Sequence, residues 1–424
     1  MQIFLLRLLV ITDFFANFAS QFFKPHISAM MIDFTLTPSV IVCLSVMVVC
    51  LLYLIFGFRR YVVSVSRRIR EDSSEEFPNE TEMEYPAISV IVYAEDDAEN
   101  LQVLLPQILN QEYPAPFEVI VVNDGAGSST KDVIARLEPE HPNLYMTFTP
   151  SESRSVSRKK LGVTLGIKAA RYDVLVHTTG NCQVPSPRWL KAIGRRFEKG
   201  TDVVICYAAP TAAADVTHEP NKRLHAFDTV RSAIEYLSWA IAGRPYRGTG
   251  HNLAYRRDLF FSNNGFSRSL DLKYGDDDVF ISGVSNGSNT AVELSTDSMV
   301  LAVEAAPAQS HREKKLRYDF TASKLRGCAR GFFKTCTIAW WGAILSAVAT
   351  AIVGLPSLTP AIIAAVLLLA IWLILMFAWK RTSLSLWSRG IFLTFPWFMS
   401  VHPIYSFIYW IRGFASRKSN YSWG

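Results

Sequence analysis

Ser39–Phe58 is a run of twenty residues without a charged side chain. Such a run is long enough to cross the hydrocarbon core of a bilayer as a helix. Basic residues follow at once, at Arg59, Arg60, Arg67, Arg68 and Arg70. Because Lys and Arg are enriched on the cytoplasmic side of membrane helices, the sequence predicts that the chain beyond this span lies in the cytoplasm.

Two further apolar stretches, 336–355 and 359–379, are each long enough to span a membrane. Cations flank this pair on its outer sides, which predicts a helical hairpin with both ends in the cytoplasm: Arg326, Arg330, Lys334, Lys380 and Arg381. The last apolar stretch, 390–410, contains two prolines and a histidine. It is interpreted as a span or an interfacial segment, and we favour the second. Residues 326–424 thus form a C-terminal membrane region of an integral membrane protein.

Residues 1–38 are an N-terminal extension of uncertain structure, in which a signal peptide is not favoured. Residues 59–85 are interpreted as a linker that is first basic and then acidic. The net charge is +6, and the basic residues cluster beside apolar runs. This pattern favours membrane lipids as partners over nucleic acid. Six cysteines without metal spacing are interpreted as reduced thiols.

Residues 86–205 alternate short β-branched runs with helical stretches. The runs are Ile88–Tyr93, Glu118–Val122 and Asp173–His177, with helical spacing over Ala98–Gln111 and Lys159–Arg171. Strand–helix alternation of this kind predicts an α/β domain with a parallel sheet. Ligands of such sheets bind beyond the carboxyl ends of the strands.

Polar residues follow all three predicted strands. They are Glu95-Asp96-Asp97, then Asn123-Asp124-Gly125, then Thr178-Thr179-Gly180-Asn181. Turn chemistry alone accounts for Asn, Asp and Gly at such places. The alternative is a binding site assembled from three loops at one edge of the sheet.

Gly275–Ile281 places Asp276, Asp277 and Asp278 in succession ahead of an apolar run. Neighbouring carboxylates raise one another's pKa, and a carboxylate with a raised pKa suits general-base catalysis. One interpretation is a solvated acidic turn, and the other is a catalytic base. Asp277 is the candidate base, with Asp276 and Asp278 beside it.

Several landmarks occur in a characteristic order: Ser89–Leu101, Gln111–Pro114, Asn123–Gly125, Ser157–Ile167, Gly275–Phe280 and Lys314–Tyr318. In this order and spacing the chain resembles a membrane-bound family 2 glycosyltransferase, of the bacterial type with one N-terminal span and a C-terminal transmembrane hairpin. Gly275–Phe280 resembles the family's Gly-Glu-Asp base motif. Lys314–Tyr318 resembles its Gln-x-x-Arg-Trp motif.

The resemblance implies an α/β GT-A fold over residues 86–325, with a Rossmann-like nucleotide-sugar half, an acceptor half and flanking transmembrane helices. It implies inverting transfer of a sugar from a nucleotide-sugar donor to a lipid-linked or glycan acceptor at the bacterial inner membrane. The donor-binding residues it implies are Ala94, Glu95, Asp97, Asn123, Asp124, Lys159, Lys160, Thr179, Asn181 and Arg317. Gly250 and Asn252 are implied on the acceptor side. A divalent cation, Mg²⁺ or Mn²⁺, is the implied cofactor, and no organic cofactor is expected.

The sequence departs from the family at the metal motif. Thr179-Gly180-Asn181 stands where Asp-x-Asp is usual, and only Asn181 offers a neutral amide oxygen to a metal. Two interpretations follow. Either the enzyme neutralises the leaving diphosphate with cations, namely Lys159, Lys160, Lys314 and Arg317, or the chain is a degenerate member that binds saccharide or a partner enzyme without transfer. The retention of Asp277 favours the enzyme.

Overall fold

The computed structural model describes residues 37–415 except 79–82, 96, 126–128, 151–156, 215 and 217–220. The predictions for residues 1–36 and for Asp96 therefore lie outside the described residues. The chain divides into two compact units. One contains the residues up to Phe58 and Thr335–Leu375, and the other contains Arg59–Lys334 and the residues from Met376 onward.

The first unit is helical. It contains α2 (Pro38–Tyr53) and most of α12 (Ala329–Val353) and α13 (Thr359–Ser385). Met47 and Leu51 of α2 pack with Ala343 of α12 and Ala364 of α13, so small side chains allow the three helices to approach closely. Trp340 stacks on Trp372 with ring centroids 5.2 Å apart.

Three helices in the described part of the chain are long and apolar enough to cross a membrane: Pro38–Ser74, Ala329–Val353 and Thr359–Ser385. The first extends well beyond the predicted end at Phe58. A π-helical turn, η2 (Leu54–Arg59), leads into α3 (Arg60–Ser74). The structure thus differs from the predicted linker over 59–85, because Val62, Val65 and Ile69 recur at helical spacing and are buried.

The second unit is built on a seven-stranded sheet with the order β3-β2-β1-β4-β8-β6-β9. Strands β3, β2, β1 and β4 are parallel, whereas β8 runs antiparallel to both β4 and β6. The bounds are β1 (Ile88–Ala94), β2 (Phe117–Asn123), β3 (Leu144–Phe148), β4 (Val174–Thr179), β6 (Val203–Ile205), β8 (Leu253–Arg256) and β9 (Thr290–Val292). A smaller sheet has the order β5-β10-β7, with β5 (Cys182–Gln183), β7 (Ala208–Ala212) and β10 (Val300–Glu304).

Helices alternate with the strands along the chain of this unit. They are α4 (Ala98–Leu109), α5 (Ser129–Leu137), α6 (Arg158–Ala169), α7 (Trp189–Gly194), α8 (Lys222–Ile241), α9 (Arg257–Ser262), α10 (Asp278–Val284) and α11 (Pro307–Thr321). Every residue of β1 is buried, which matches a central strand with covered faces. Leu101, Leu104 and Ile108 of α4 enter the same core. The predicted α/β fold class is confirmed.

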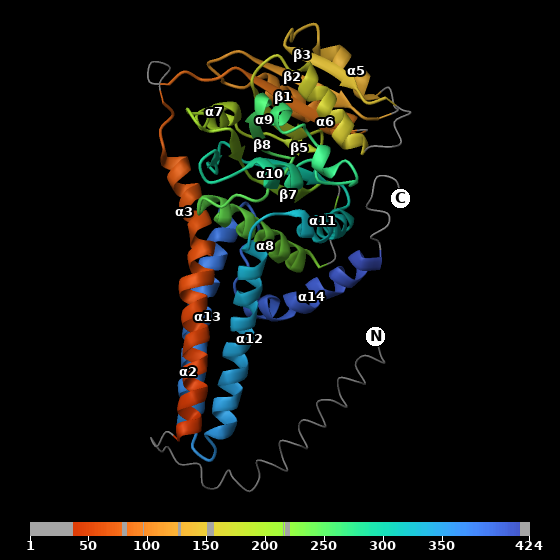
Figure 1. Ribbon diagram of the computed structural model, residues 1–424. Coiled ribbons are helices and arrows are strands. Elements are labelled where there is room, and N and C mark those ends of the chain that lie inside the picture. Colours follow the sequence, from red (N-terminus) through yellow and green to blue (C-terminus); the bar gives the residue numbers. More distant parts are fainter. Residues whose placement is uncertain are drawn as a thin grey trace. The chain divides into compact units, whose positions relative to one another are not determined.

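Helix α14 (Phe395–Ala415) packs against α8 and α11 (Figure 1). On its packed side, His402 Nε2 lies 2.8 Å from Asp228 Oδ1 of α8, and Tyr405 OH lies 3.1 Å from His311 Nε2 of α11. Its other side exposes large apolar residues: Trp397, Ile404, Phe407, Ile408 and Ile411. This division into a polar and an apolar side is typical of a helix that lies in a membrane interface.

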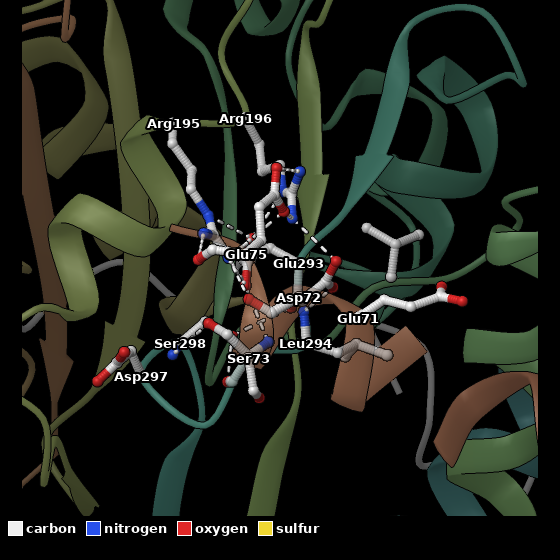
Figure 2. A network of polar contacts seen from close by, with 12 residues as sticks. Glu71, Asp72, Ser73, Glu75, Arg195, Arg196, Glu293, Leu294, Asp297 and Ser298 are labelled. Atoms are coloured by element: carbon white, nitrogen blue, oxygen red, sulfur yellow. Dashed lines mark hydrogen bonds and ion pairs between the residues drawn. The ribbon is translucent and has the colours of Figure 1, made fainter. Parts of the chain in front are cut away.

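A buried ion network binds the end of α3 to the segment that follows β9 (Figure 2). The Glu293 side chain is fully buried and accepts from Arg195 Nε at 3.1 Å and from Arg196 Nε at 2.6 Å. Arg196 also reaches Asp72 of α3 at 2.8 Å, and Asp72 accepts from the Leu294 N–H at 2.9 Å. The helix that follows the first membrane segment is therefore bound to the β9–β10 connection by charge-assisted hydrogen bonds.

Replacing Glu293→Gln should destabilise this unit. The buried Arg195 and the partly buried Arg196 would lose their shared anion, and removing one partner of a buried ion pair costs about 3–5 kcal/mol. We expect a fall of several degrees in the thermal unfolding midpoint of the purified full chain. Glu198→Gln, at an exposed position near the same arginines, should leave the midpoint unchanged. Equal midpoints for both variants would contradict a stabilising role for the network.

Candidate active site

The ends of three parallel strands meet at one edge of the large sheet. Ala94 of β1 pairs with Asn123 of β2, and Tyr93 pairs with Thr179 of β4. Beyond the strands, the Asp124 N–H donates to the Ala94 carbonyl and the Gly180 N–H to the Tyr93 carbonyl, both at 2.8 Å. The polar clusters recognised in the sequence therefore do converge at this edge.

Asp124 and Asp97 occupy this edge in different ways. The Tyr93 hydroxyl donates to Asp124, and Arg158 Nη2 lies 2.5 Å from Asp124 Oδ1. Asp97 lies against Gly180, where an added Cβ would be 2.8 Å from the Asp97 Cβ. A glycine is thus required at 180 because the β1 loop approaches the β4 turn so closely. Glu95 is exposed beside them.

The acidic stretch leads into α10, and each of its carboxylates meets a different cation. Lys159 Nζ of α6 lies 2.8 Å from Asp276 Oδ2, and Arg317 Nη2 of α11 lies 3.5 Å from Asp277 Oδ2. Asp278 is 3.9 Å from Arg247 Nη2 and accepts a hydrogen bond from the Thr321 hydroxyl of α11. These three pairs assemble the stretch from segments far apart in the sequence. A solvated acidic turn is excluded, because Asp277 and Asp278 are almost completely buried.

The environments of the two buried carboxylates differ. Burial acts to raise the pKa of Asp277, but Arg317, Lys159 and the N–H groups of Gly250 and Asp278 outweigh it and hold the pKa below the usual range. Burial and the charge of Asp277 raise the pKa of Asp278. The prediction of a raised pKa for Asp277 is therefore wrong. It considered the neighbouring aspartates and not the cations that the fold brings in.

A small pocket opens beside these groups. Asp276, Asp277 and Lys159 line it together with the last residues of β4, His177, Thr178 and Thr179. Burial, and then the charge of Lys159, lower the pKa of His177 to about 3, so this imidazole is neutral and lies stacked on Tyr255. The pocket is thus lined by one ammonium group, two carboxylates and the neutral imidazole of His177.

Thr179-Gly180-Asn181 does not provide the donor set of a divalent metal. The Asn181 amide oxygen accepts from the Thr179 hydroxyl at 2.7 Å, and its amide nitrogen donates to the Val303 carbonyl at 3.0 Å. Hard cations such as Mg²⁺ and Mn²⁺ favour carboxylate oxygens. Within the described residues, no group of three or more His, Cys, Asp or Glu side chains is placed to hold a metal ion. The side chain of Asn181 therefore serves the fold rather than a metal.

Three of the predicted site residues have other roles in the structure. Lys160 is buried and donates to the carbonyls of Ser269 and Leu272, the second at 2.7 Å, so it holds the loop ahead of the acidic stretch. Asn252 is fully buried, and its amide contacts Trp189, Tyr207 and Ser298. The Lys160 side chain is therefore not placed to bind a nucleotide-sugar donor, and the Asn252 side chain is not placed to bind an acceptor substrate. The Gly250 N–H donates to Asp277 Oδ2 at 3.0 Å, so Gly250 orients the candidate base.

The remaining predicted residues lie at the periphery of the pocket. Lys314 of α11 is paired with Glu304 at the end of β10, at 3.2 Å. Asn123 is buried, and its Oδ1 accepts from the Gly125 N–H at 3.1 Å, which shapes the turn after β2. The Ala94 side chain is also buried. These residues shape the edge on which the charged groups lie.

Arg247 and Thr321 were not predicted from the sequence. The Arg247 guanidinium is buried, with its central carbon 3.3 Å from the centroid of the Tyr318 ring, and both Arg247 and Thr321 contact Asp278. Tyr318 belongs to the recognised Lys314–Tyr318 motif. Its aromatic ring was therefore a signal that a cation stacks there.

The site thus combines polar loops at one sheet edge with a buried carboxylate and paired cations. A sequence model of glycosyl transferase family 21 matches residues 42–423, nearly the whole chain. The chain belongs to glycosyl transferase family 21. The predicted enzyme class is thereby confirmed, while the matching model is that of family 21 rather than family 2.

Among curated proteins, the glycosyltransferase AglE of Haloferax volcanii is 28% identical over 121 residues, which is 28% of this chain and 38% of AglE. The match therefore spans well under two thirds of that relative. Among solved structures, the mannosyltransferase PcManGT from Pyrobaculum calidifontis, in complex with GDP-Man and Mn²⁺, is 17% identical with a TM-score of 0.47, covering 81% of this chain and 96% of its own. S. aureus TarS is 18% identical with a TM-score of 0.37, covering 55% and 39%.

The adjacent Lys159 and Lys160 should respond differently to the same substitution. Burial lowers the pKa of Lys160 to about 8, yet its ammonium group satisfies two buried carbonyls. Lys160→Met would leave both unsatisfied, at about 1–3 kcal/mol each, and should lower the thermal unfolding midpoint. Lys159→Met, beside the pocket, should reduce activity with a much smaller fall in the midpoint. If both variants lost stability equally, Lys159 would be structural.

Proposed function

We propose that this protein is an inverting glycosyltransferase that moves a sugar from a nucleotide-sugar donor to a lipid-linked or glycan acceptor at the inner face of a membrane. Asp277 is its general base, and the observation that carries this role is the setting of its carboxylate. It is buried, ionised, oriented by the Gly250 N–H and placed on the wall of the pocket at the strand ends. The nucleotide lies along the edge formed by Ala94, Asn123 and Asp124.

The chemistry requires a base because a sugar or lipid hydroxyl is a weak nucleophile. As the acceptor oxygen attacks the anomeric carbon, its proton passes to Asp277. The bond between the anomeric carbon and the diphosphate oxygen breaks in the same displacement, and the nucleoside diphosphate leaves with the electron pair. A single displacement of this kind inverts the anomeric configuration.

Asp276 and Asp278 support the base without replacing it. Asp276 holds Lys159 at the pocket, and the side chain of Asp278 is bound by Thr321 of α11. Burial and the charge of Asp277 raise the pKa of Asp278, which disfavours a second negative charge at this point. We therefore assign proton transfer to Asp277 alone.

The position relative to the membrane rests on the flanking sequence. The first apolar helix is followed by Arg59 and Arg60, and the last of the three apolar helices contains Lys380 and Arg381 near its end. The positive-inside rule supports a catalytic unit in the cytoplasm, and we propose a bacterial inner membrane as its location. The interfacial character of α14 favours a lipid-linked acceptor, because such a substrate presents its reactive end at the membrane surface.

Asp277→Asn is the direct test. The amide keeps the shape of the side chain but is a very poor base, so transfer should fall by about 10²–10⁴-fold. The assay is sugar release and transfer by membranes that contain the full chain, with a panel of UDP- and GDP-sugars. Thermal unfolding would show that the variant is folded.

Asp258→Asn, at an exposed aspartate on α9, is the matched control and should retain full activity. Equal background signals from wild type and Asp277→Asn would contradict the proposal that the protein is an active glycosyltransferase. In that case the chain binds saccharide or a partner enzyme without transfer, as the altered Thr179-Gly180-Asn181 motif would also permit.

A further inference from the structure

One cation, Lys159, lines the pocket, and a second, Arg317, is paired with Asp277, a carboxylate that also lines it. Lys159 Nζ is 2.8 Å from Asp276 and Arg317 Nη2 is 3.5 Å from Asp277. The charge of Arg317 is one of those that act on Lys159, so the two cations lie within electrostatic reach of each other. Meanwhile the Asn181 amide groups are occupied by Thr179 and Val303.

We propose that the donor diphosphate is bound by Lys159 and Arg317 in place of a divalent metal, and that both cations leave Asp276 and Asp277 when the donor binds. This rests on the proposed glycosyl transfer and adds how the leaving group is neutralised. In the donor-free protein the carboxylates hold the cations ready. In the complex the diphosphate oxygens replace the carboxylate oxygens as their partners.

The exchange is physically reasonable because the resting contacts are incomplete. Arg317 approaches Asp277 through one nitrogen at 3.5 Å, longer than the 2.7–2.9 Å of a strong charge-assisted hydrogen bond. Its buried Nε has no hydrogen-bond partner among the described residues. A diphosphate offers several charged oxygens, which suit the fork of a guanidinium group.

Lys159 contributes from a second direction. It lies in the first turn of α6, at the end where the helix dipole is positive. Its side chain is about one quarter exposed, at 24%, and lines the pocket with Asp276. A lysine in this place is a mobile point charge that follows an anion over a short distance.

Donor binding then changes the base. Burial alone would raise the pKa of Asp277, and Arg317 and Lys159 are the largest of the influences that oppose it. Once both cations face the diphosphate, the opposing influence weakens and the pKa of Asp277 moves upward. The Asp277 carboxylate therefore becomes a stronger base only after the donor, with its diphosphate leaving group, is bound.

Nucleoside diphosphate binding tests the proposal without requiring turnover. Purified full chain in detergent is titrated calorimetrically with UDP and with GDP, first in EDTA and then in Mn²⁺ or Mg²⁺. For the nucleotide that binds, we expect affinities within about twofold in all three conditions. Lys159→Met and Arg317→Met should each weaken binding about tenfold or more, equivalent to ~1.4 kcal/mol. Arg317→Lys should restore part of the loss.

Lys168→Met is the matched control, since Lys168 is an exposed lysine on the same helix and should not affect binding. Binding that is lost in EDTA and restored by Mn²⁺ would overturn the proposal, as would unchanged affinity in both Lys159→Met and Arg317→Met. Neither result would contradict the proposed glycosyl transfer. Metal-independent binding without any turnover in wild type would instead reject the transfer and leave the binding site standing.

The pH dependence provides a second readout. The acid limb of kcat/KM follows Asp277 in the free enzyme, and that of kcat follows it in the donor complex. The base works when ionised, so activity is lost as the pH falls through its pKa. Because the cations lower that pKa only in the free enzyme, we expect the acid limb of kcat to lie at higher pH than that of kcat/KM. Coincident limbs would contradict the release of the cations.

Discussion

The site depends on one electrostatic constraint, namely that three successive carboxylates have to be buried. Burying an unpaired charge is costly, and each neighbour of like sign adds to the cost. The fold meets this constraint by bringing one cation to each carboxylate from α6, from the loop before β8 and from α11. These contacts also join α6 and α11 to the acidic stretch. The same pairs therefore hold the fold together and position the charged groups that line the pocket, which are Lys159, Asp276 and Asp277.

The sequence predicted much of the fold of this unit, and the parts that it did not predict were missed for physical reasons. The β-branched runs of β1, β2 and β4 gave the parallel half, and the polar residues after them marked the edge of the site. Strands β8, β6 and β9, of which β8 runs antiparallel to its neighbours, are only three or four residues long, too short for a periodic signal. Arg247 was missed because its partner, Asp278, is brought to it by tertiary packing alone.

Lys159 and Lys160 show why residue type did not settle residue role. Successive residues of a helix point about 100° apart, so two adjacent lysines cannot face the same group. Lys159 turns to Asp276, and Lys160 turns under the chain to Ser269 and Leu272. The pKa of Asp277 illustrates the same limit. From the sequence only like charges were visible beside it, whereas the cations that reverse the sign of the shift come from distant segments.

The altered metal motif, Thr179-Gly180-Asn181, and the acidic stretch are related through the cations that the acidic stretch binds. The charges of Lys159 and Arg317 repel each other, so the two cations require anions nearby. Asp276 and Asp277 supply those anions, so the carboxylates act as counter-ions in the donor-free site, and in the proposed reaction Asp277 is then the base. A bound metal ion would compete with Lys159 and Arg317 for the same carboxylates and the same diphosphate. A site already furnished with this cation pair therefore has little use for the Asp-x-Asp ligands, and Thr179 and Asn181 are free to stabilise the turn after β4.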